Sequence, residues 1–393
     1  MKTKYLIVGN GIAGLSAAKE IRKNDTKGSI LMVTKESYLT YWRMKLSELL
    51  PKTIKKDGLL INNESWYKEN NIEVLLNKSV TKINSEEKDV ILDDNSAISY
   101  DKLLIATGSS PFIPFIKGNE KLGVFALKTL DDLREIQDYL KNCGTVSVIG
   151  GGLLGIEAAW SLSHVVKKVN IIEFAPYLLH KQLDKEISHK LADRIMGEGI
   201  NLFLSQETEE VIGDERVTGI RLKSKDLINT NAILISAGVR PNLELVKDTN
   251  IKYNRGIVID QQLRTNVDDI YAAGDVAEVD GNIIGLWTVG LEQGKIAGAN
   301  MSGQNILFTK PKLSTTLKIK DIQVFSAGDI FNYDRIYEYR DDDKDIHHKI
   351  YTKDKKIVGV ILYGDLKEMN KLRNAVFNNI NIEDYLREGL SFM

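Results

Sequence analysis

The sequence has 393 residues, of which 43% are hydrophobic and 27% are charged, and its formal net charge is -1. This length exceeds what one hydrophobic core usually supports, so we expect two or three domains. The near-neutral charge excludes a general attraction to nucleic acid or to anionic membranes. The single cysteine, Cys143, excludes an intramolecular disulfide and a redox-active thiol pair. The apolar run at residues 5–8 is too short for a signal peptide, and no stretch approaches the roughly 20 apolar residues of a membrane helix, so we expect a cytoplasmic protein without a membrane segment.

One sequence pattern occurs twice along the chain. An apolar strand leads into a glycine turn and then into an alanine-rich helix, first within residues 5–21 and again within residues 146–162. Each copy continues into a second apolar strand, at 29–33 and at 169–172. A strand, a helix and a parallel strand in this order form the β-α-β unit of nucleotide-binding folds. The repeat therefore predicts an α/β protein with two Rossmann-like dinucleotide-binding domains.

The segments outside the repeat predict further strands, two linkers and a small last domain. Strands that end in small-residue turns are expected at 100–108, 232–238 and 270–275. We expect linkers at 109–114 and 303–311, with a helix at 292–300 before the second linker. Beyond it, strands with hairpin-like turns are expected at 322–326, 335–339, 348–351 and 357–362. With a terminal helix, these strands predict a small α+β domain.

Each glycine turn has the G-x-G-x-x-G spacing, follows a strand and opens a helix. The glycines are Gly9, Gly11 and Gly14 in the first copy and Gly150, Gly152 and Gly155 in the second. Glycines let a pyrophosphate approach the helix N-terminus, where free N–H groups and the helix dipole favour negative charge. Tight helix packing without a nucleotide is the alternative role for these glycines. Between the last two glycines of the turns stand Ile12, Ala13, Leu153 and Leu154, which we expect at the same sites.

An acidic residue follows each repeat near the position that contacts an adenosine ribose. Glu173 ends the second strand of its unit, 18 residues after the last glycine (173 − 155 = 18), where a carboxylate accepts both ribose hydroxyls. No arginine follows at 174–176 to pair with a 2′-phosphate, so the sequence favours NADH over NADPH. In the first unit the candidates are Thr34, Lys35 and Glu36, of which we expect Glu36 to bind the ribose.

Motifs along most of the chain resemble the flavoprotein reductases that have two dinucleotide-binding domains. The motifs lie at 9–14, 106–108, 150–157, 236–242 and 271–277. The resemblance implies that FAD binds the first unit, that NADH binds a second unit inserted in the first, and that Asp275 holds the ribityl chain of FAD. It also implies FAD contacts at Ala106, Thr107, Gly108, Gly238 and Gly274. The expected domains are therefore an FAD-binding domain at 1–110 and 236–304, an NAD-binding domain at 111–235, and a C-terminal α+β domain at 305–393.

A closer resemblance links the chain to the NADH:rubredoxin reductases and to the flavin domains of nitrite reductases. It rests on residues 38–47, 317–329 and 358–365. It implies that Arg43 binds the FAD pyrophosphate and that Lys318 lies at the flavin. We also expect Lys45, Val80 and Trp287 at the cofactor, because backbone N–H groups around Trp287 would stabilise reduced flavin. As catalytic residues the resemblance implies Glu157, which orients the nicotinamide–flavin stack, and Lys318, which reaches the flavin pyrimidine edge.

Two positions depart from the pattern of these relatives. Met44 stands where proline is usual, and Glu48 stands where many relatives place a lysine that pairs with the glutamate matching Glu157. The loss of that lysine changes the polar network at the flavin edge.

The lack of a relay cysteine predicts that electrons pass directly from FAD to an outside acceptor. The resemblance makes rubredoxin, or a similar small acidic electron carrier, the expected partner of this NADH-dependent reductase. A basic run offers a docking patch for the carrier, or else a merely solvated face, at Lys310, Lys312, Lys318 and Lys320. The other functions left open are a reductase for a different iron–sulfur protein, an NADH oxidase, and a redox-sensing interaction protein that binds FAD and NADH.

The remaining polar features predict structural roles. We expect His347 and His348 on a surface strand rather than at a metal, and residues 341–345 at a solvated hairpin tip. Cys143 is expected to be a structural residue at a helix end. The sequence therefore predicts no metal site, and a monomer or weak dimer is expected.

Overall fold

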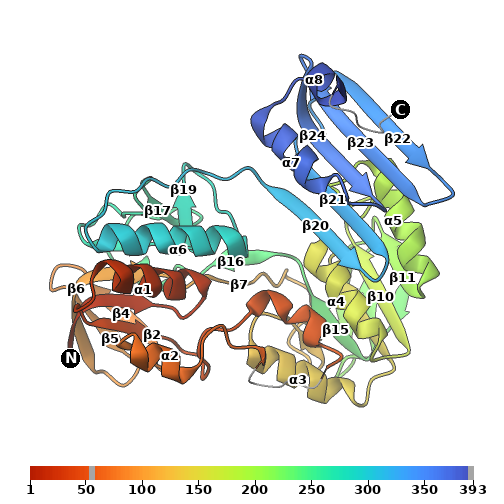
Figure 1. Ribbon diagram of the computed structural model, residues 1–393. Helices are drawn as coiled ribbons and strands as arrows, with labels where there is room; N and C mark the ends of the chain where they lie inside the picture. The colour runs from red at the N-terminus through yellow and green to blue at the C-terminus, as the bar shows by residue number, and fades with distance from the viewer. Residues whose placement is uncertain (53–57, 388–393) are drawn as a thin grey trace. The chain divides into compact units, whose positions relative to one another are not determined.

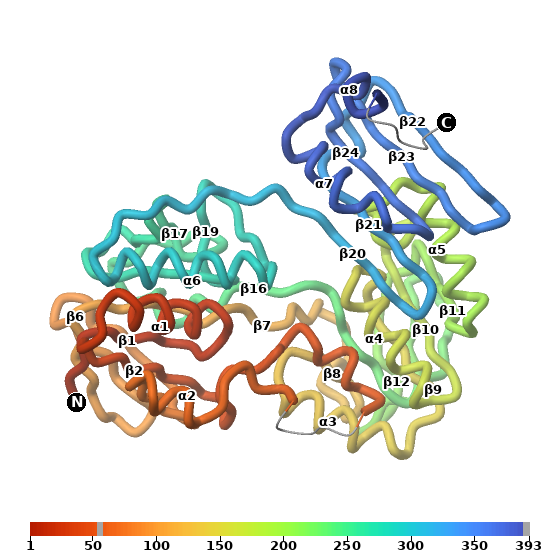
Figure 2. The backbone as a smooth tube through the Cα atoms, viewed as in Figure 1, coloured from red at the N-terminus to blue at the C-terminus, as the bar shows by residue number. Residues whose placement is uncertain are grey.

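The computed structural model describes residues 1–52 and 58–387 (Figure 1). By their internal contacts these residues form two compact units. Unit 1 comprises residues 1–45, 58–112 and 238–310, and unit 2 comprises residues 46–52, 113–237 and 311–387. Each unit is thus assembled from segments far apart in the sequence, as the colours of the backbone tube in Figure 2 show. None of the helices in the described ranges combines the length and the apolar character that a bilayer crossing requires.

Unit 1 is built on a sheet with the strand order β3-β2-β1-β6-β5-β4, to which β18 adds by pairing with β6. Its strands are β1 (Lys2–Val8), β2 (Ile30–Val33), β3 (Ile72–Leu75), β4 (Val80–Asn84), β5 (Asp89–Leu92), β6 (Ala97–Ile105) and β18 (Ile270–Ala272). β1 pairs in parallel with β2 and β6, and β5 pairs antiparallel with β4 and β6. All four residues of β2 are buried, as expected for a parallel strand that is covered on both faces.

The helices of unit 1 are α1 (Ile12–Asn24), α2 (Glu64–Glu69) and α6 (Trp287–Met301). α6 lies alongside α1 (Figure 1). The two helices approach closely, because a Cβ on Gly294 would lie only 2.2 Å from the carbonyl oxygen of Ala13. The helix expected at 292–300 begins earlier than predicted, at Trp287. Its glycine at 294 allows the close contact with α1.

Two short strand pairs complete unit 1. β7 (Ser109–Pro111) pairs antiparallel with β16 (Val239–Pro241), and β17 (Ile257–Ile259) pairs in parallel with β19 (Ala277–Val279). The segment expected to be a linker at 109–114 thus begins with a paired strand.

Unit 2 contains a parallel sheet with the strand order β11-β10-β9-β15-β8 and a small antiparallel sheet, β12-β13-β14. The strands of the parallel sheet are β8 (Val124–Phe125), β9 (Thr145–Ile149), β10 (Lys168–Glu173), β11 (Ile200–Leu204) and β15 (Ala232–Ile235). The small sheet consists of β12 (Thr208–Ile212), β13 (Gly219–Leu222) and β14 (Leu227–Asn229). The helices of this part are α3 (Leu130–Leu140), α4 (Leu153–Ser163) and α5 (Lys185–Gly197).

The C-terminal part of unit 2 is an antiparallel sheet with the strand order β20-β21-β24-β23-β22. Its strands are β20 (Ser314–Ile319), β21 (Ile322–Gly328), β22 (Arg335–Asp341), β23 (Ile346–Lys353) and β24 (Lys356–Tyr363). α7 (Met369–Asn378) packs on β21 and β24, and α8 (Ile382–Arg387) follows it. Two sheets with parallel β-α-β units and a separate antiparallel sheet with helices confirm the predicted fold class.

Candidate functional site

The first glycine turn joins β1 to α1 in unit 1 and leaves room for a ligand at its middle glycine. Gly9 has a φ of +116°, and a Cβ there would lie 2.1 Å from the carbonyl oxygen of Ala106. A Cβ on Gly14 would lie 2.1 Å from the carbonyl oxygen of Gly9, so the helix packs tightly onto the turn. A Cβ on Gly11, which caps α1, would meet no atom of the described residues within 4 Å. This geometry fits a pyrophosphate at the start of α1.

The second turn, between β9 and α4 in unit 2, repeats this geometry. Gly150 has a φ of +121°, and a Cβ there would lie 2.4 Å from the carbonyl oxygen of Ser236. A Cβ on Gly155 would lie 2.0 Å from the carbonyl oxygen of Gly150. A Cβ on Gly152, the cap of α4, would again have nothing within 4 Å in the part of the chain that the structure describes. Each unit therefore has its own opening of the shape that a dinucleotide pyrophosphate requires.

The residues that follow Gly11 and Gly152 form the first turns of the two helices. Ile12 and Ala13 begin α1, while Leu153 and Leu154 begin α4. Leu154 is 59% exposed, although it is a large apolar side chain in an otherwise well-covered helix. The N–H groups of these first turns have no side-chain cap, because glycine stands at both cap positions.

Glu36, the predicted ribose ligand of unit 1, is held in place by two neighbours. The Arg43 guanidinium lies 2.6 Å from Glu36 Oε1, and the Tyr41 hydroxyl donates to Oε2 at 2.6 Å. A carboxylate offers about four lone-pair positions, so it can still accept hydroxyl groups. Thr34, which is buried, accepts a hydrogen bond from the Glu36 N–H, and Lys35 is exposed. The structure therefore brings together the residues predicted for ribose and pyrophosphate.

The second strand-and-turn of unit 1 ends at residues 106–108, where Gly108 has a φ of +67°. The Thr107 carbonyl accepts a hydrogen bond from the Asn242 amide at 2.8 Å, and the Asn242 N–H donates to the Gly108 carbonyl at 3.0 Å. Gly238, with a φ of +97°, accepts a hydrogen bond from the Phe112 N–H at 2.8 Å. Asn242 belongs to the motif at 236–242, but its role in fastening this turn was not predicted from the sequence.

Asp275 follows β18 in unit 1, where the resemblance predicts a contact to the ribityl chain. The Ser109 hydroxyl donates to Asp275 Oδ2 at 2.6 Å. Gly274, with a φ of +82°, donates its N–H to the side chain of Gln293 at 2.8 Å and packs on Ala13. Asp275 is thus fixed by β7 on one side and by the α1–α6 pair on the other.

Trp287 begins α6, and its ring stacks on that of Trp42 with a centroid distance of 5.2 Å and an interplanar angle of 26°. The Lys45 ammonium lies 5.6 Å from the Trp42 ring centroid, within the range of a cation–π contact. The predicted contact residue Val80 begins β4, close to the backbone pairing of Lys78 with Thr34. Trp42 was not predicted, although its place inside the segment 38–47 was a usable signal.

A buried polar group behind the first turn was also missed. Asn10 donates to the Tyr38 carbonyl at 3.0 Å, and its side-chain oxygen accepts a hydrogen bond from Thr40. Thr40 also contacts the Tyr67 hydroxyl at 3.0 Å. The polar residue between two glycines of the turn was the available signal. These contacts tie the turn to the segment that carries Arg43.

Glu173, the predicted NADH ribose ligand, ends β10 and is 8% exposed. Its carboxylate accepts hydrogen bonds from the N–H of Gly151 and, at 2.7 Å, from the N–H of Ala175. The carboxylate is therefore placed against the second glycine turn. Phe174 beside it is 72% exposed, and no cation stands between residues 174 and 176 to receive a 2′-phosphate.

Glu157, the predicted catalytic residue, lies in α4, two positions past Gly155. Burial, and to a smaller extent the neighbouring carboxylate of Glu48, raise the pKa of Glu157 to about 7. Glu48 stands on the short helix η2 (Ser47–Leu49), which packs against α4. Lys318 is exposed on β20, which also packs against α4. Glu48, the departure noted in the sequence, therefore adds to the larger effect of burial in raising the pKa of Glu157 to about 7.

The basic run is not a free patch. Lys312 donates to the carbonyl of Phe377, and the ammonium of Lys320 lies 3.0 Å from Glu198 Oε1. Lys310 and Lys318 are exposed. Lys310 belongs to unit 1 and the other three lysines belong to unit 2. The sequence run therefore supports a docking role less than its spacing suggested, because Phe377 and Glu198 hold two of its members.

The prediction that His347 and His348 lie on a surface strand is wrong. Their exposed fractions are 0% and 7%. The acidic first turn of α5 brings Glu186 close to His347, while the ring of His348 contacts the Asp365 carbonyl at 2.8 Å. His347 lies with Glu338 and Glu186 in a group whose ligand atoms fall within 4.8 Å of one another. The Lys349 ammonium already binds Glu186 at 2.5 Å, so we interpret the group as an ion-pair network.

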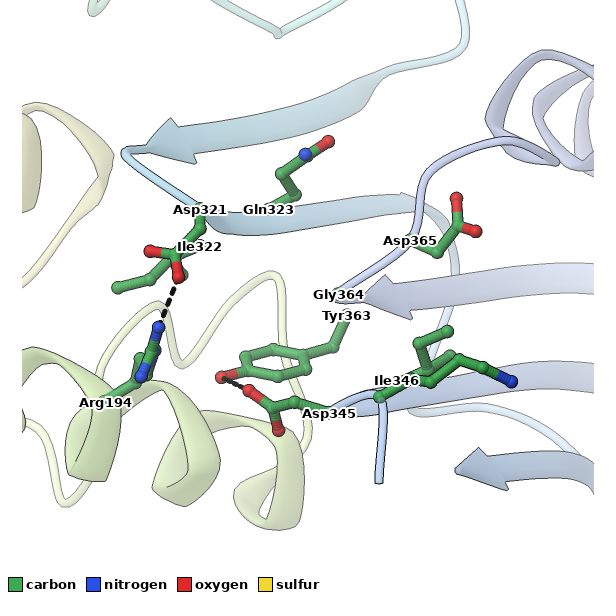
Figure 3. A pocket seen from close by; sticks show the side chains of 10 residues that line it. Arg194, Asp321, Ile322, Gln323, Asp345, Ile346, Tyr363, Gly364 and Asp365 are labelled. Atoms are coloured by element: carbon green, nitrogen blue, oxygen red, sulfur yellow. Dashed lines mark hydrogen bonds and ion pairs between the residues drawn. The ribbon is translucent and has the colours of Figure 1, made fainter. Parts of the chain in front are cut away.

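A pocket of about 300 Å³ lies between α5 and the C-terminal sheet (Figure 3). Arg194 pairs with Asp321 at one side, and the Tyr363 hydroxyl donates to Asp345 at 3.3 Å (Figure 3). None of the residues that line it is a predicted cofactor contact. Because its charged groups already have partners, we assign no ligand to this pocket.

The two remaining structural predictions agree with the structure. Residues 342–345 form the turn between β22 and β23, at the expected hairpin tip. Cys143 follows α3, and its thiol contacts the carbonyl of Tyr139 at 3.4 Å. Burial raises the pKa of this thiol, which makes it less reactive.

Comparison with known proteins gives two family matches. Residues 3–294 match the family model described as "Pyridine nucleotide-disulphide oxidoreductase", and residues 314–380 match "Rubredoxin NAD+ reductase C-terminal domain". Together these matches extend from the first strand of unit 1 into the segment that follows α7.

Similar individual proteins span the whole chain. The chain is 35% identical over 98% of its length to a nitrite reductase [NAD(P)H] of Bacillus subtilis, and it covers 48% of that protein. It is 34% identical to the NADH-rubredoxin oxidoreductase of Clostridium acetobutylicum, with 99% of each chain covered. A crystal structure of NADH:rubredoxin oxidoreductase from that organism superposes with a TM-score of 0.84, at 32% identity, covering 99% of this chain and 100% of the other. The chain spans about half the length of the Bacillus subtilis relatives that it matches.

Proposed function

Because the chain belongs to the pyridine nucleotide-disulphide oxidoreductase family, we propose that it takes hydride from NADH and delivers electrons, by way of FAD, to rubredoxin or a similar small one-electron carrier. The family membership also confirms the predicted resemblance and the predicted cofactors, FAD and NADH. The observation that carries the proposal is the pair of glycine turns, one in each unit, whose middle glycines are both open. Two openings of this kind call for two dinucleotides.

We assign FAD to the opening in unit 1. The contacts supporting this choice are Glu36 for the ribose, Arg43 for the pyrophosphate and Asp275 for the ribityl chain. Arg43 and Glu36 hold each other at 2.6 Å, and Ser109 fixes Asp275. The side chains are therefore in place before a ligand arrives, which lowers the entropy cost of binding.

We assign NADH to the opening in unit 2. Glu173 presents its carboxylate beside the second turn, and a 2′-phosphate there would face this negative charge without a cation at residues 174–176. Discrimination against NADPH follows from the repulsion and from the unpaired phosphate. Glu157, near the start of α4, orients the nicotinamide by holding or releasing a proton at its carboxyl group.

FAD, when bound, supplies hydride acceptance and stepwise release of single electrons. The overall reaction then balances as one NADH and two oxidised carriers giving NAD⁺, one proton and two reduced carriers. Cys143, the only cysteine of the sequence, is poorly suited to relay electrons, because its thiol contacts a helix carbonyl and burial raises its pKa. The match of residues 314–380 to a rubredoxin reductase C-terminal domain supports rubredoxin as the carrier.

The proposed cofactors are tested by measuring flavin content and reduction in the purified protein. We expect about one FAD per chain and faster bleaching of the flavin by NADH than by NADPH. A protein that stays colourless after incubation with FAD would refute the enzyme proposal. Equal rates with both nucleotides would refute the assignment of Glu173.

The proposed acceptor is tested by steady-state assays with rubredoxin, a ferredoxin and oxygen, each at several salt concentrations. Small electron carriers meet their reductases through small interfaces, so charge steering governs the encounter and weakens above about 0.1 M salt. We expect rubredoxin reduction to slow with salt while flavin reduction by NADH does not. An equally fast reaction with oxygen would instead identify an NADH oxidase. Flavin reduction with no efficient acceptor would favour a redox-sensing interaction protein.

A further inference from the structure

The loop at residues 174–184 connects the proposed ribose carboxylate to α5 and is fastened to the second glycine turn. The Leu179 N–H donates to the Gly151 carbonyl at 3.2 Å, while the Gly151 N–H donates to Glu173. The Leu178 side chain packs so closely that a Cβ on Gly151 would lie 2.6 Å from it. The glycine turn, the carboxylate and the start of this loop therefore form one connected group.

The far end of the same loop is fastened to the C-terminal sheet. Asp184 caps α5 by accepting the Ile187 N–H at 2.9 Å with one carboxylate oxygen. Its other oxygen accepts the Tyr351 hydroxyl at 2.6 Å and the Lys349 ammonium at 2.9 Å. Lys349 also binds Glu186 at 2.5 Å. Two side chains of β23 thus hold the start of α5, and with it the end of the loop.

These contacts are partly buried and involve charged groups, which makes them strong. Tyr351 is 1% exposed and the Lys349 side chain is 6% exposed. Burial by itself would raise the pKa of Asp184, but hydrogen bonds from Tyr351, from the Ile187 N–H and from Lys349 outweigh it and lower this pKa. Asp184 therefore stays ionised at neutral pH, and hydrogen bonds to a charged group are worth about twice as much as neutral ones.

A second contact couples α5 to the loop. The Ser188 hydroxyl, one turn into α5, donates to the Leu178 carbonyl at 2.7 Å, and Ser188 is fully buried. A displacement of the start of α5 would therefore move Leu178, which packs on Gly151. The chain of contacts from β23 to the glycine turn has no break.

We infer that Tyr351 and Lys349, in the C-terminal sheet, are positioning residues for the adenosine end of the NADH site. They act through Asp184 and the loop at 174–184, which places Glu173 and Gly151. The inference rests on the proposed function, because it takes the second glycine turn as the NADH site. It gives the C-terminal sheet a part in nucleotide binding in addition to any part in carrier docking.

The test compares two nearly isosteric variants on the same strand. Tyr351→Phe removes the hydroxyl that binds Asp184. The control, Thr352→Val, removes a buried hydroxyl on the next residue, which donates to the Arg335 carbonyl at 3.2 Å within the sheet. The affinity of the holoenzyme for ADP-ribose, which carries the adenosine but no nicotinamide, is measured by calorimetry.

We expect Tyr351→Phe to raise the Kd of ADP-ribose by about two- to thirtyfold, the range for residues that act through a network. The KM for NADH should rise with it, while the rate of flavin reduction at saturating NADH stays within about twofold. Thr352→Val should leave both constants unchanged even if it lowers the melting temperature. Lys349→Arg should retain more affinity than Lys349→Met, because arginine keeps the charge between the two carboxylates.

Two results would overturn the inference. One is a Tyr351→Phe protein whose ADP-ribose Kd equals that of the wild type. The other is a Thr352→Val protein that loses affinity to the same degree, since the effect would then reflect general weakening of the sheet. Wild-type protein that binds no ADP-ribose would instead refute the proposed function, and the inference with it.

Discussion

Replacing Glu48 by lysine should change the pH dependence of NADH oxidation, because it removes the carboxylate that faces Glu157. The pKa of Glu157 is raised from 4.5 to about 7, first by burial and then by Glu48. Each pKa unit corresponds to about 1.36 kcal/mol, so the whole shift represents at most about 3 kcal/mol of disfavoured ionisation. Glu48 is exposed, so solvent screens its share. We therefore expect lysine at position 48 to lower the pKa of Glu157 by about one unit, the low end for an opposite neighbouring charge.

The sign of the effect on stability follows from the raised pKa. A carboxyl whose pKa is higher in the folded state contributes stability that is full below its unfolded pKa, near 4.5, and is lost as the pH rises through about 7. The wild type should therefore lose stability over this interval. In Glu48→Lys the loss should be smaller and should end at a lower pH.

The assay is the rate constant of flavin reduction by NADH, measured by stopped flow across the neutral range. We expect an inflection near pH 7 in the wild type, a lower one in Glu48→Gln and the lowest in Glu48→Lys. Glu157→Gln should have no inflection. Glu135→Lys, which makes the same charge change at an exposed position of α3, should behave like the wild type. An inflection that stays near pH 7 in both Glu48 variants would show that Glu48 does not influence the pKa of Glu157.

Three further substitutions and one control substitution test the site and the fold. Glu173→Ala should raise the KM for NADH and so narrow the preference for NADH over NADPH, since hydrogen bonds to a charged group contribute about 1.5–3 kcal/mol. An unchanged ratio of the KM values for NADH and NADPH would contradict this prediction. Asp275→Ala should raise the Kd of FAD in a flavin titration and leave the ADP-ribose Kd unchanged, and the reverse pattern would mean that the two sites are exchanged. Gly294→Ala should lower the melting temperature, because its Cβ would lie 2.2 Å from the Ala13 carbonyl and overpacking costs about 1–3 kcal/mol. Gly197→Ala in α5, where a Cβ meets no described atom within 4 Å, should leave the melting temperature unchanged. An equal fall in melting temperature in both glycine variants would show that the contact between α1 and α6 is not the cause.

The sequence predicted the features of the site that depend on local pattern. The glycine turns could be recognised because the strand, the turn and the helix are neighbours in the chain, and their backbone geometry follows from glycine itself. Glu173 could be placed because it ends the strand that follows the second turn. The same reasoning suggested Glu36 in the first unit, where the structure adds the ion pair with Arg43.

Features that depend on distant segments were not predictable from pattern. The residues at 109–111 looked like part of a linker, because their partner strand begins at residue 239. His347 looked exposed, because the helix whose first turn approaches it lies about 160 residues earlier in the chain. Lys312 and Lys320 looked free, because Phe377 and Glu198 are remote in sequence. In each case tertiary contacts decided the burial or the pairing of residues whose local sequence is polar.

The most direct test of the proposed electron path is the reoxidation of the NADH-reduced protein, which is prepared anaerobically and followed by stopped flow. The reduced protein is mixed in one series with oxidised rubredoxin and in another with oxygen at the same concentration. We expect rubredoxin to restore the flavin absorbance faster than oxygen does, with two rubredoxins reduced for each NADH consumed. Reoxidation by oxygen at an equal or higher rate, or a flavin that rubredoxin does not reoxidise, would contradict the proposed electron path.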